Sequence, residues 1–167
     1  MVYTKTRDVT SPTRAHATDA GIDFFVPNAS EEFFGDVQEK NDTKHLGYNK
    51  ATGEIFIPGS GSILIPAGIK VKVPDGLALV AFNKSGVASN KQLIAGACVV
   101  DIGYTGEVHI NVINTSSQPV TINCGEKLMQ FVLLHVEFSN PQEVTNEEYN
   151  KQTGSDRGEG GFGSSNK

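Results

Sequence analysis

Apolar and polar residues alternate along several short stretches of the chain. Residues 69–73, IKVKV, and 108–112, VHINV, alternate strictly, as half-buried strands do. Residues 62–66, 77–82 and 127–138 are short, mainly apolar runs rich in β-forming residues. The pattern therefore predicts a chain built mainly of short β-strands.

Turn-forming residues separate these stretches. They are PAG at 66–68, PDG at 74–76, TSSQP at 115–119 and NCGE at 123–126. Many short strands joined by regular turns are typical of an all-β sandwich or barrel. We therefore expect one all-β domain over residues 1–138.

Two stretches break this rhythm. Residues 28–54 are polar and rich in turn formers, which predicts a surface excursion inserted between strands. Residues 139–167 carry no strong strand or helix pattern, apart from a possible turn at 146–150, and predict a C-terminal arm.

Composition narrows the class of protein. The chain has 167 residues, of which 38% are hydrophobic, and its net charge is −5. This charge argues against a nucleic-acid polymer as partner, because a phosphate backbone requires a basic surface. No apolar run is long enough to span a membrane, and the N-terminus lacks the apolar core of a signal peptide. We expect a cytoplasmic protein without a membrane partner, in which Cys98 and Cys124 are free thiols.

Residues 96–110, GACVVDIGYTGEVHI, predict a strand, a turn and a second strand, that is, a hairpin. Asp101 stands where the first strand ends. A turn aspartate can accept backbone N–H bonds, or its carboxylate can act as a general base with Tyr104 as a flat platform beside it. The residue pattern alone leaves both roles open.

Two further stretches carry groups that suit phosphate. Residues 83–89, NKSGVAS, offer an ammonium, a hydroxyl and backbone N–H groups after a strand. Gln130 lies within an apolar strand, where it faces solvent or has a specific partner. Asp23, between Ile22 and Phe24, is either a satisfied polar group on a strand or part of a site.

The C-terminal GSDRGEGGFGSSNK combines many glycines with Arg157 and Phe162. Arginine is scarce, since Arg7 and Arg14 are the only others in the sequence. A glycine-rich segment that carries one planar cation and one aromatic ring is unusual for a purely solvated tail.

In order and approximate spacing, five motifs resemble those of the trimeric deoxyuridine triphosphatase (dUTPase) family. They are ATDAGIDFF, NKSGVA, GACVVDIGYTGE, GEKLMQFVL and RGEGGFGSS, spread over residues 15–165. The resemblance implies a jelly-roll-like distorted β-barrel that assembles as a homotrimer with a C-terminal arm. It also implies hydrolysis of dUTP to dUMP and pyrophosphate, with Mg²⁺ bridging the triphosphate.

The resemblance also implies roles for individual residues. Asp101 would activate the water that attacks the α-phosphorus, and Tyr104 would lie against the deoxyribose. Asp23 would support the metal indirectly, through water. The uracil edge would be read by the backbone of Ala95, Gly96, Cys98, Val99 and Val100. The phosphates would be held by Lys84, Ser85, Gly86 and Gln130. The arm would act as a lid, often completing a neighbouring subunit's site, through Arg157, Phe162, Gly163 and Ser164.

Three residues depart from the family pattern. Lys84 stands where the family usually has arginine, and an ammonium cannot make the planar two-pronged contact. Asn83 replaces a proline and so removes some rigidity. Cys98 replaces a glycine, which is tolerated only if its φ is not positive.

Two other functions compete with dUTP hydrolysis. A dCTP deaminase of the same fold would need a glutamate in the base-binding pocket, and Glu107 is expected to lie past the turn. A nucleotide-sensing regulatory protein would use residues 28–54 to contact its partner. A zinc enzyme is disfavoured, because His16, His45, His109 and His135 form no close-spaced ligand set with the cysteines.

Overall fold

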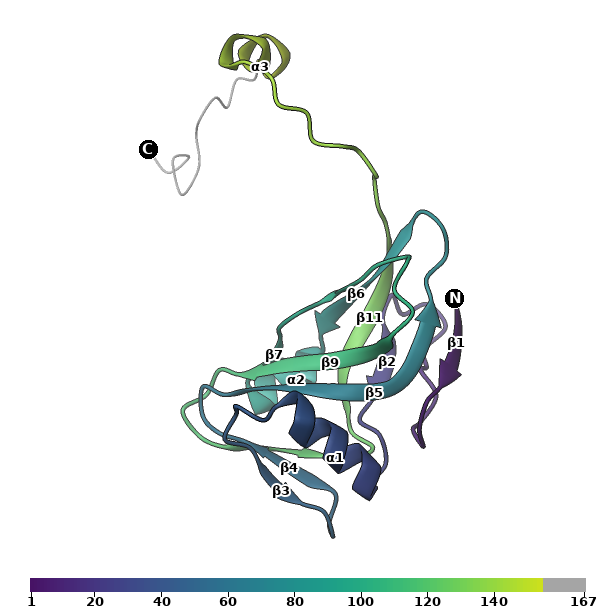
Figure 1. Cartoon of the computed structure of the whole chain (residues 1–167), viewed down its shortest axis with the longest axis vertical. Helices are drawn as coiled ribbons and strands as arrows, with labels where there is room; N and C mark the ends of the chain where they lie inside the picture. Colours follow the sequence, from purple (N-terminus) through teal and green to yellow (C-terminus); the bar gives the residue numbers. More distant parts are fainter. Residues whose placement is uncertain (155–167) are drawn as a thin grey trace. The chain divides into compact units, whose positions relative to one another are not determined.

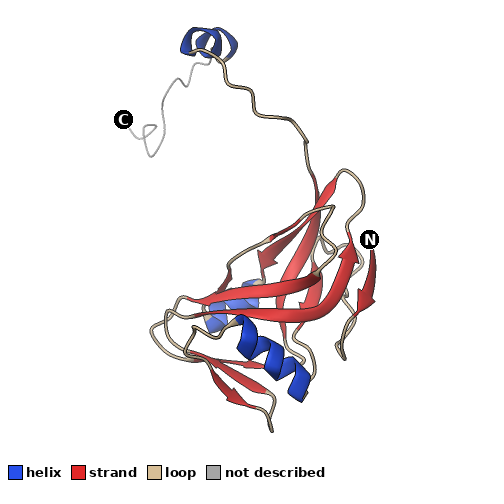
Figure 2. Cartoon of the chain, in the orientation of Figure 1, coloured by secondary structure: helices blue, strands red, loops and turns tan. Residues whose placement is uncertain are grey.

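The computed structural model describes residues 1–154. The chain divides into two units, the first Met1–Val136 and the second beginning at Glu137. Strands dominate the first unit (Figure 1, Figure 2). The predicted predominance of β-structure is confirmed, with three short helices that the pattern did not predict.

The first sheet holds the two longest alternating stretches. Its strand order is β1(Val2–Lys5), β5(Ser62–Lys72), β9(Glu107–Asn114), β7(Leu93–Ala95), and every neighbouring pair is antiparallel. The turn predicted at 66–68 is instead an irregularity inside β5, which runs unbroken through Gly68 at φ +71°. A side chain at Gly68 would clash with Arg7 and Val9, so glycine lets β5 bend there.

Two further antiparallel sheets complete the first unit. One has the order β2(Ile22–Phe25), β11(Lys127–His135), β6(Leu77–Asn83), β8(Val99–Val100). The other has the order β10(Val120–Asn123), β4(Glu54–Ile57), β3(Gly47–Asn49). Phe24 and Phe131 are buried, with ring centroids 4.4 Å apart, and join β2 to β11 in the core.

The prediction of a hairpin over 96–110 is wrong. β8 pairs with β6, whereas β9 pairs with β5 and β7. The two strands therefore belong to different sheets, and the chain between them crosses from one sheet to the other. Alternation reports which faces are buried, but not which strands pair, and so it could not reveal this separation.

Residues 28–54 are mostly exposed, but they form more than a surface excursion between strands. The stretch contains α1(Glu31–Lys40), whose first turn is capped by Ser30 accepting from Phe33 N–H at 3.0 Å. Phe33, Phe34 and Val37 are almost completely buried. Each contributes about 1.5–3 kcal/mol of burial, so α1 is part of the core.

The remaining helices are short. α2(Ser85–Lys91) follows β6, and α3(Asn146–Gln152) lies in the second unit. The turn expected at 146–150 is therefore a helix, begun by a capping box between Thr145 and Glu148. No helix within residues 1–154 is long and apolar enough to cross a membrane.

Candidate functional site

A cavity of about 170 Å³ opens where β8 and β9 diverge into their separate sheets. We call it the β8–β9 pocket. Five predicted site residues line it: Cys98, Val99, Val100, Asp101 and Tyr104. The other lining residues are Leu64, Ala97, Glu107, Val108, His109, Asn111 and Phe131. The pocket has room for one small planar heterocycle, and the consecutive residues 97–101 contribute to its lining.

Ala95 and Gly96, also predicted for this site, lie beside the pocket rather than in its lining. Ala95 N–H donates to Asn83 Oδ1 at 2.6 Å, and Gly96 N–H donates to the Asn111 carbonyl at 2.9 Å. Asn83, which stands in place of the family's proline, therefore ties β6 to the chain that enters the pocket wall.

Asn111, which was not among the residues predicted for this site, holds that wall in place. Its Oδ1 accepts from Ala97 N–H at 2.7 Å, and its Nδ2 donates to the Ile63 carbonyl at 2.9 Å. A Cβ on Gly96 would meet Asn111 Oδ1 at 1.9 Å, so this position requires glycine. A polar residue on the alternating, half-buried face of β9 was the available signal.

Asp101 and Tyr104 are held by the backbone of one turn. Tyr104 N–H donates to the Asp101 carbonyl at 3.1 Å, and the Tyr104 hydroxyl donates to the Glu107 carbonyl at 2.8 Å. The Asp101 carboxylate is exposed and makes no hydrogen bond within residues 1–154. It is therefore available to accept a proton from a water molecule.

Cys98 satisfies the condition set by its departure from the family pattern. The non-glycine residues with positive φ in the described chain are Ser60 and Gln92. Cys98 therefore avoids the left-handed region, and the cysteine adds no backbone strain there. Cys98 and Cys124 are both free thiols, as predicted.

Glu107 lies past the turn, as expected, because it is the first residue of β9, but it also lines the pocket. Its two oxygens are already engaged, however. Arg7 donates to both of them at 3.2 and 3.0 Å, and Gly68 N–H donates to Oε1. A carboxylate held in this way is poorly suited to act as a base in a deamination.

His109 is a second polar residue that sequence reasoning did not place in the pocket. Burial, and then the nearby positive charge of Lys40, lower the pKa of its imidazole. Its Nε2 is buried without a hydrogen-bond partner in the described part of the chain.

A second hollow, of about 420 Å³, gathers the residues expected to hold phosphate. It is lined by Lys84, Ser85, Gly86, Val87, Lys127 and Gln130, and we call it the lysine pocket. Gln130 Nε2 donates to the Asn83 carbonyl at 2.8 Å. A Cβ on Gly21 would meet Gln130 Oε1 at 2.0 Å, which explains the glycine of the first motif.

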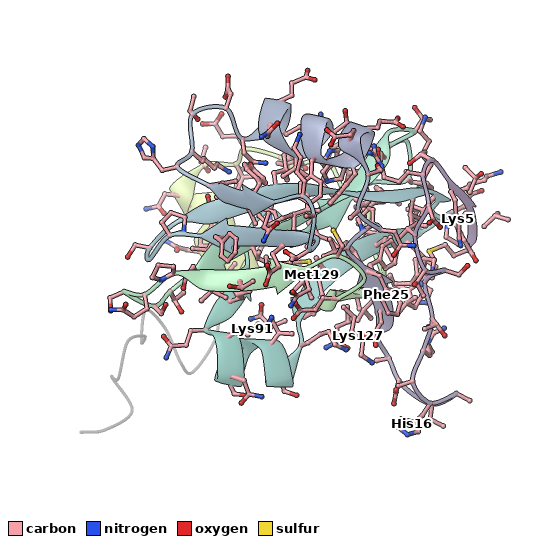
Figure 3. All side chains as sticks on the ribbon, turned by 90° about the horizontal axis from the view of Figure 1, so that it is seen from below. Lys5, His16, Phe25, Lys91, Lys127 and Met129 are labelled. Atoms are coloured by element: carbon pink, nitrogen blue, oxygen red, sulfur yellow. The ribbon has the colours of Figure 1, made fainter. Side chains whose placement is uncertain are left out.

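Asp23 is 4% exposed and lies between two lysines. Lys84 contacts its Oδ1, and Lys127 Nζ lies 3.1 Å from its Oδ2. Strand register causes this convergence, since Gln130 pairs with Asp23 and Lys127 pairs with Phe25, its neighbour in Figure 3. Asp23 is thus a counter-ion for two cations, and its expected indirect contact with a metal stays a prediction.

Lys127, which also lines the lysine pocket, was not among the residues predicted to hold phosphate. No group of three or more His, Cys, Asp or Glu side chains within residues 1–154 is arranged to hold a metal ion.

Within one chain, the β8–β9 pocket and the lysine pocket lie apart. Val100 pairs with Leu79, which places Asp101 level with Ala78 at one end of β6, whereas Lys84 follows the other end. At about 3.3 Å per residue, roughly 20 Å of strand separates them. The remaining predicted site residues, Arg157, Phe162, Gly163 and Ser164, lie outside the described residues.

Comparisons with known proteins agree on one family. The dUTPase family model matches residues 44–166. The chain is 30% identical over 166 residues to the deoxyuridine 5'-triphosphate nucleotidohydrolase of Debaryomyces hansenii, covering 99% of this chain and 86% of that protein.

Two solved structures share the fold at lower identity. The dUTPase of Staphylococcus bacteriophage 80alpha, solved with dUPNHPP, has a TM-score of 0.73 at 21% identity, over 98% of this chain and 96% of that one. A mutant dUTPase from phage phi11 of S. aureus, described with a structural Mg(II) ion, has a TM-score of 0.65 at 20% identity, over 88% of this chain and 97% of that one.

Proposed function

The chain belongs to the dUTPase family, and on that premise we propose that it hydrolyses dUTP to dUMP and pyrophosphate. The observation that carries the proposal is the β8–β9 pocket, in which Asp101 and Tyr104 share one cavity with the backbone of residues 97–100. The pocket joins a proton acceptor, an aromatic platform and a backbone surface able to read a base.

Asp101 is the general base in this proposal. Its free carboxylate removes a proton from water as the water oxygen bonds to the α-phosphorus. The bond from the α-phosphorus to the bridging oxygen breaks, and pyrophosphate leaves with that oxygen. General bases contribute about 10²–10⁴ to rate, which fits a reaction whose other requirements are positioning and charge stabilisation.

Selectivity follows from the wall of the pocket. Backbone donors and acceptors near Cys98, Val99 and Val100 would pair with the uracil edge, because a mismatched base would leave buried polar groups without partners. The small volume would exclude the methyl group of thymine. Tyr104 would lie against the deoxyribose and leave no space for a 2′-hydroxyl.

The lysine pocket would hold the phosphates through Lys84, Ser85, Gly86 and Gln130, with Lys127 as a further donor. Both lysines reach Asp23, so the triphosphate would compete with a built-in carboxylate for their charge. Because the described side chains form no metal site, Mg²⁺ would arrive as part of a Mg²⁺–dUTP substrate and retain waters of its own.

We further propose a homotrimer whose active sites are shared between subunits. The roughly 20 Å of β6 between Asp101 and Lys84 supports this, because one nucleotide cannot easily reach both groups of one chain. A neighbouring subunit would supply the second pocket. The arm, with Arg157 over the γ-phosphate, Phe162 over uracil, and Gly163 and Ser164 on phosphate oxygens, would close the site as a lid.

Incubation with each deoxynucleoside triphosphate and Mg²⁺, followed by separation of products, tests the activity. We expect dUMP and pyrophosphate from dUTP, and no reaction in excess chelator. Equal turnover of dTTP or dCTP would contradict uracil selectivity, and ammonia released from dCTP would indicate a deaminase instead.

Mixing two inactive variants tests the shared site. Asp101→Asn and Arg157→Ala chains, refolded together, should regain activity in about a quarter of sites by random assortment in a cyclic trimer. Tagged mixed trimers as inactive as either parent would show that the arm serves its own subunit.

The alternative of a regulatory protein that contacts its partner through residues 28–54 receives no support from the fold. α1 lies within that stretch and supplies buried side chains to the core. Its deletion would therefore disturb folding as well as any partner surface.

A further inference from the structure

Helix α1 is linked to the β8–β9 pocket through an arginine. Arg7 Nη2 donates to Asp36 Oδ2 on α1 at 2.8 Å and to Glu107 Oε2 at 3.0 Å, while its Nε donates to Glu107 Oε1. The side chains of Arg7 and Glu107 are 11% and 16% exposed. A planar two-pronged contact at this depth holds both partners in one orientation.

Glu107, which Arg7 holds in place, also contacts the turn that contains Tyr104. Its carbonyl accepts from the Tyr104 hydroxyl at 2.8 Å, and a Cβ on Gly106 would meet that hydroxyl at 2.4 Å. The tyrosine ring is thus folded back over its own turn and anchored on the first residue of β9. Any shift of Glu107 moves the anchor of the ring.

A second link joins the other end of α1 to the same cavity. Asn41, the C-cap of α1, is 2% exposed. Its Nδ2 donates to the Leu64 carbonyl at 2.8 Å, and its Oδ1 accepts from Leu64 N–H at 2.9 Å. Leu64 lines the pocket and pairs across the sheet with Asn111, which holds the pocket wall.

We propose that α1 is a brace for the β8–β9 pocket, and that Asp36 is a positioning residue for selection of the sugar. Through Arg7 and Glu107, Asp36 sets the place of the Tyr104 ring, and Asn41 holds the opposite wall. The inference rests on the proposed function, because it takes Tyr104 as the group against the deoxyribose. Helix α1 precedes residues 44–166, which are the part of the chain that the family model matches. The proposed role of α1 therefore does not depend on that match.

Binding of dUMP and UMP, measured by calorimetry on the full chain, tests the proposal without requiring turnover. Asp36→Asn keeps the size of the side chain and removes its charge. We expect about three- to ten-fold weaker dUMP binding and a similar fall in the preference for dUMP over UMP, in line with the loss of one part-buried ion pair. Asp36→Glu should restore both. Arg7→Lys, which loses the two-pronged contact with Glu107, should have the larger effect.

Glu39→Gln is the matched control, because Glu39 is exposed on the same helix and forms no ion pair in the described chain. Unchanged dUMP binding and sugar preference in Asp36→Asn would overturn the brace, as would equal changes in Glu39→Gln. Failure of the unmodified chain to bind dUMP would also overturn it. Binding of dUMP without hydrolysis of dUTP would overturn the proposed function alone.

Discussion

The β8–β9 pocket and the lysine pocket differ in the groups that line them. The first is walled by backbone that Asn111 and neighbouring strands hold in place. The second depends on long, charged side chains that converge on one buried carboxylate, Asp23.

The difference shows where sequence change is tolerated. A backbone wall accepts Cys98 in place of glycine, because only φ matters there and φ is not positive. In the lysine pocket, Lys84 and Lys127 share one carboxylate, Asp23. If the proposed roles hold, selection of the base would depend on a rigid fold, and affinity for phosphate on long charged side chains.

Asp101→Asn should give the largest effect, because within residues 1–154 it removes the one carboxylate of the pocket lining that makes no hydrogen bond, while keeping the side chain's shape. We expect turnover to fall by about 10²–10⁴, with dUMP binding largely retained. Steady-state kinetics and calorimetry measure the two. Near-normal turnover would mean that Asp101 is only a turn residue. The β8–β9 pocket would then contribute to nucleotide binding and supply no catalytic base.

Lys84→Ala tests the lysine pocket. Triphosphate binding should weaken about 10- to 100-fold, the range for loss of a charged hydrogen bond, with a smaller effect on dUMP. Lys127→Ala should act in the same direction. Lys5→Ala, on exposed β1 and labelled in Figure 3, is the control. An equal effect of Lys84→Ala on triphosphate and dUMP would assign Lys84 to the surface.

Asn111→Ala tests whether backbone alone defines the base. It leaves Ala97 N–H and the Ile63 carbonyl without their partner. We expect the preference for dUTP over dCTP, compared as kcat/KM, to fall about ten-fold, with phosphate affinity unchanged. Asn90→Ala, an exposed residue of α2, is the control. A preference equal to that of the unmodified chain would show that the wall holds without Asn111.

The smallest effect should come from pH. Because burial lowers the pKa of His109 below its usual 6.5, the unfolded chain binds a proton that the folded chain does not. Stability therefore falls as pH decreases through the region below about 6.5. His109→Gln should lose less thermal stability than the unmodified chain between about pH 7 and 5. Exposed His135→Gln is the control, and equal losses in both variants would contradict the assignment.

The sequence by itself determined the local features of this protein. Alternation located β9 and the second half of β5, because one face of each strand must be apolar to be buried. The motifs identified Asp101 and Tyr104 for one pocket and Lys84, Ser85, Gly86 and Gln130 for the other. The sequence alone indicates these residues, because each has a characteristic side-chain chemistry and lies at a defined spacing from a glycine or a turn.

Only the tertiary structure decided which of these pieces meet. Divergence of β8 and β9 into separate sheets opens a cavity where the pattern predicted a hairpin. α1 was hidden because only three of its side chains are buried within a mostly polar stretch. The pairing of Lys127 with Asp23, and of Arg7 with Glu107, joins residues about 100 positions apart. Strand partners and long-range ion pairs depend on the packing of the whole core, so a local sequence pattern cannot predict them.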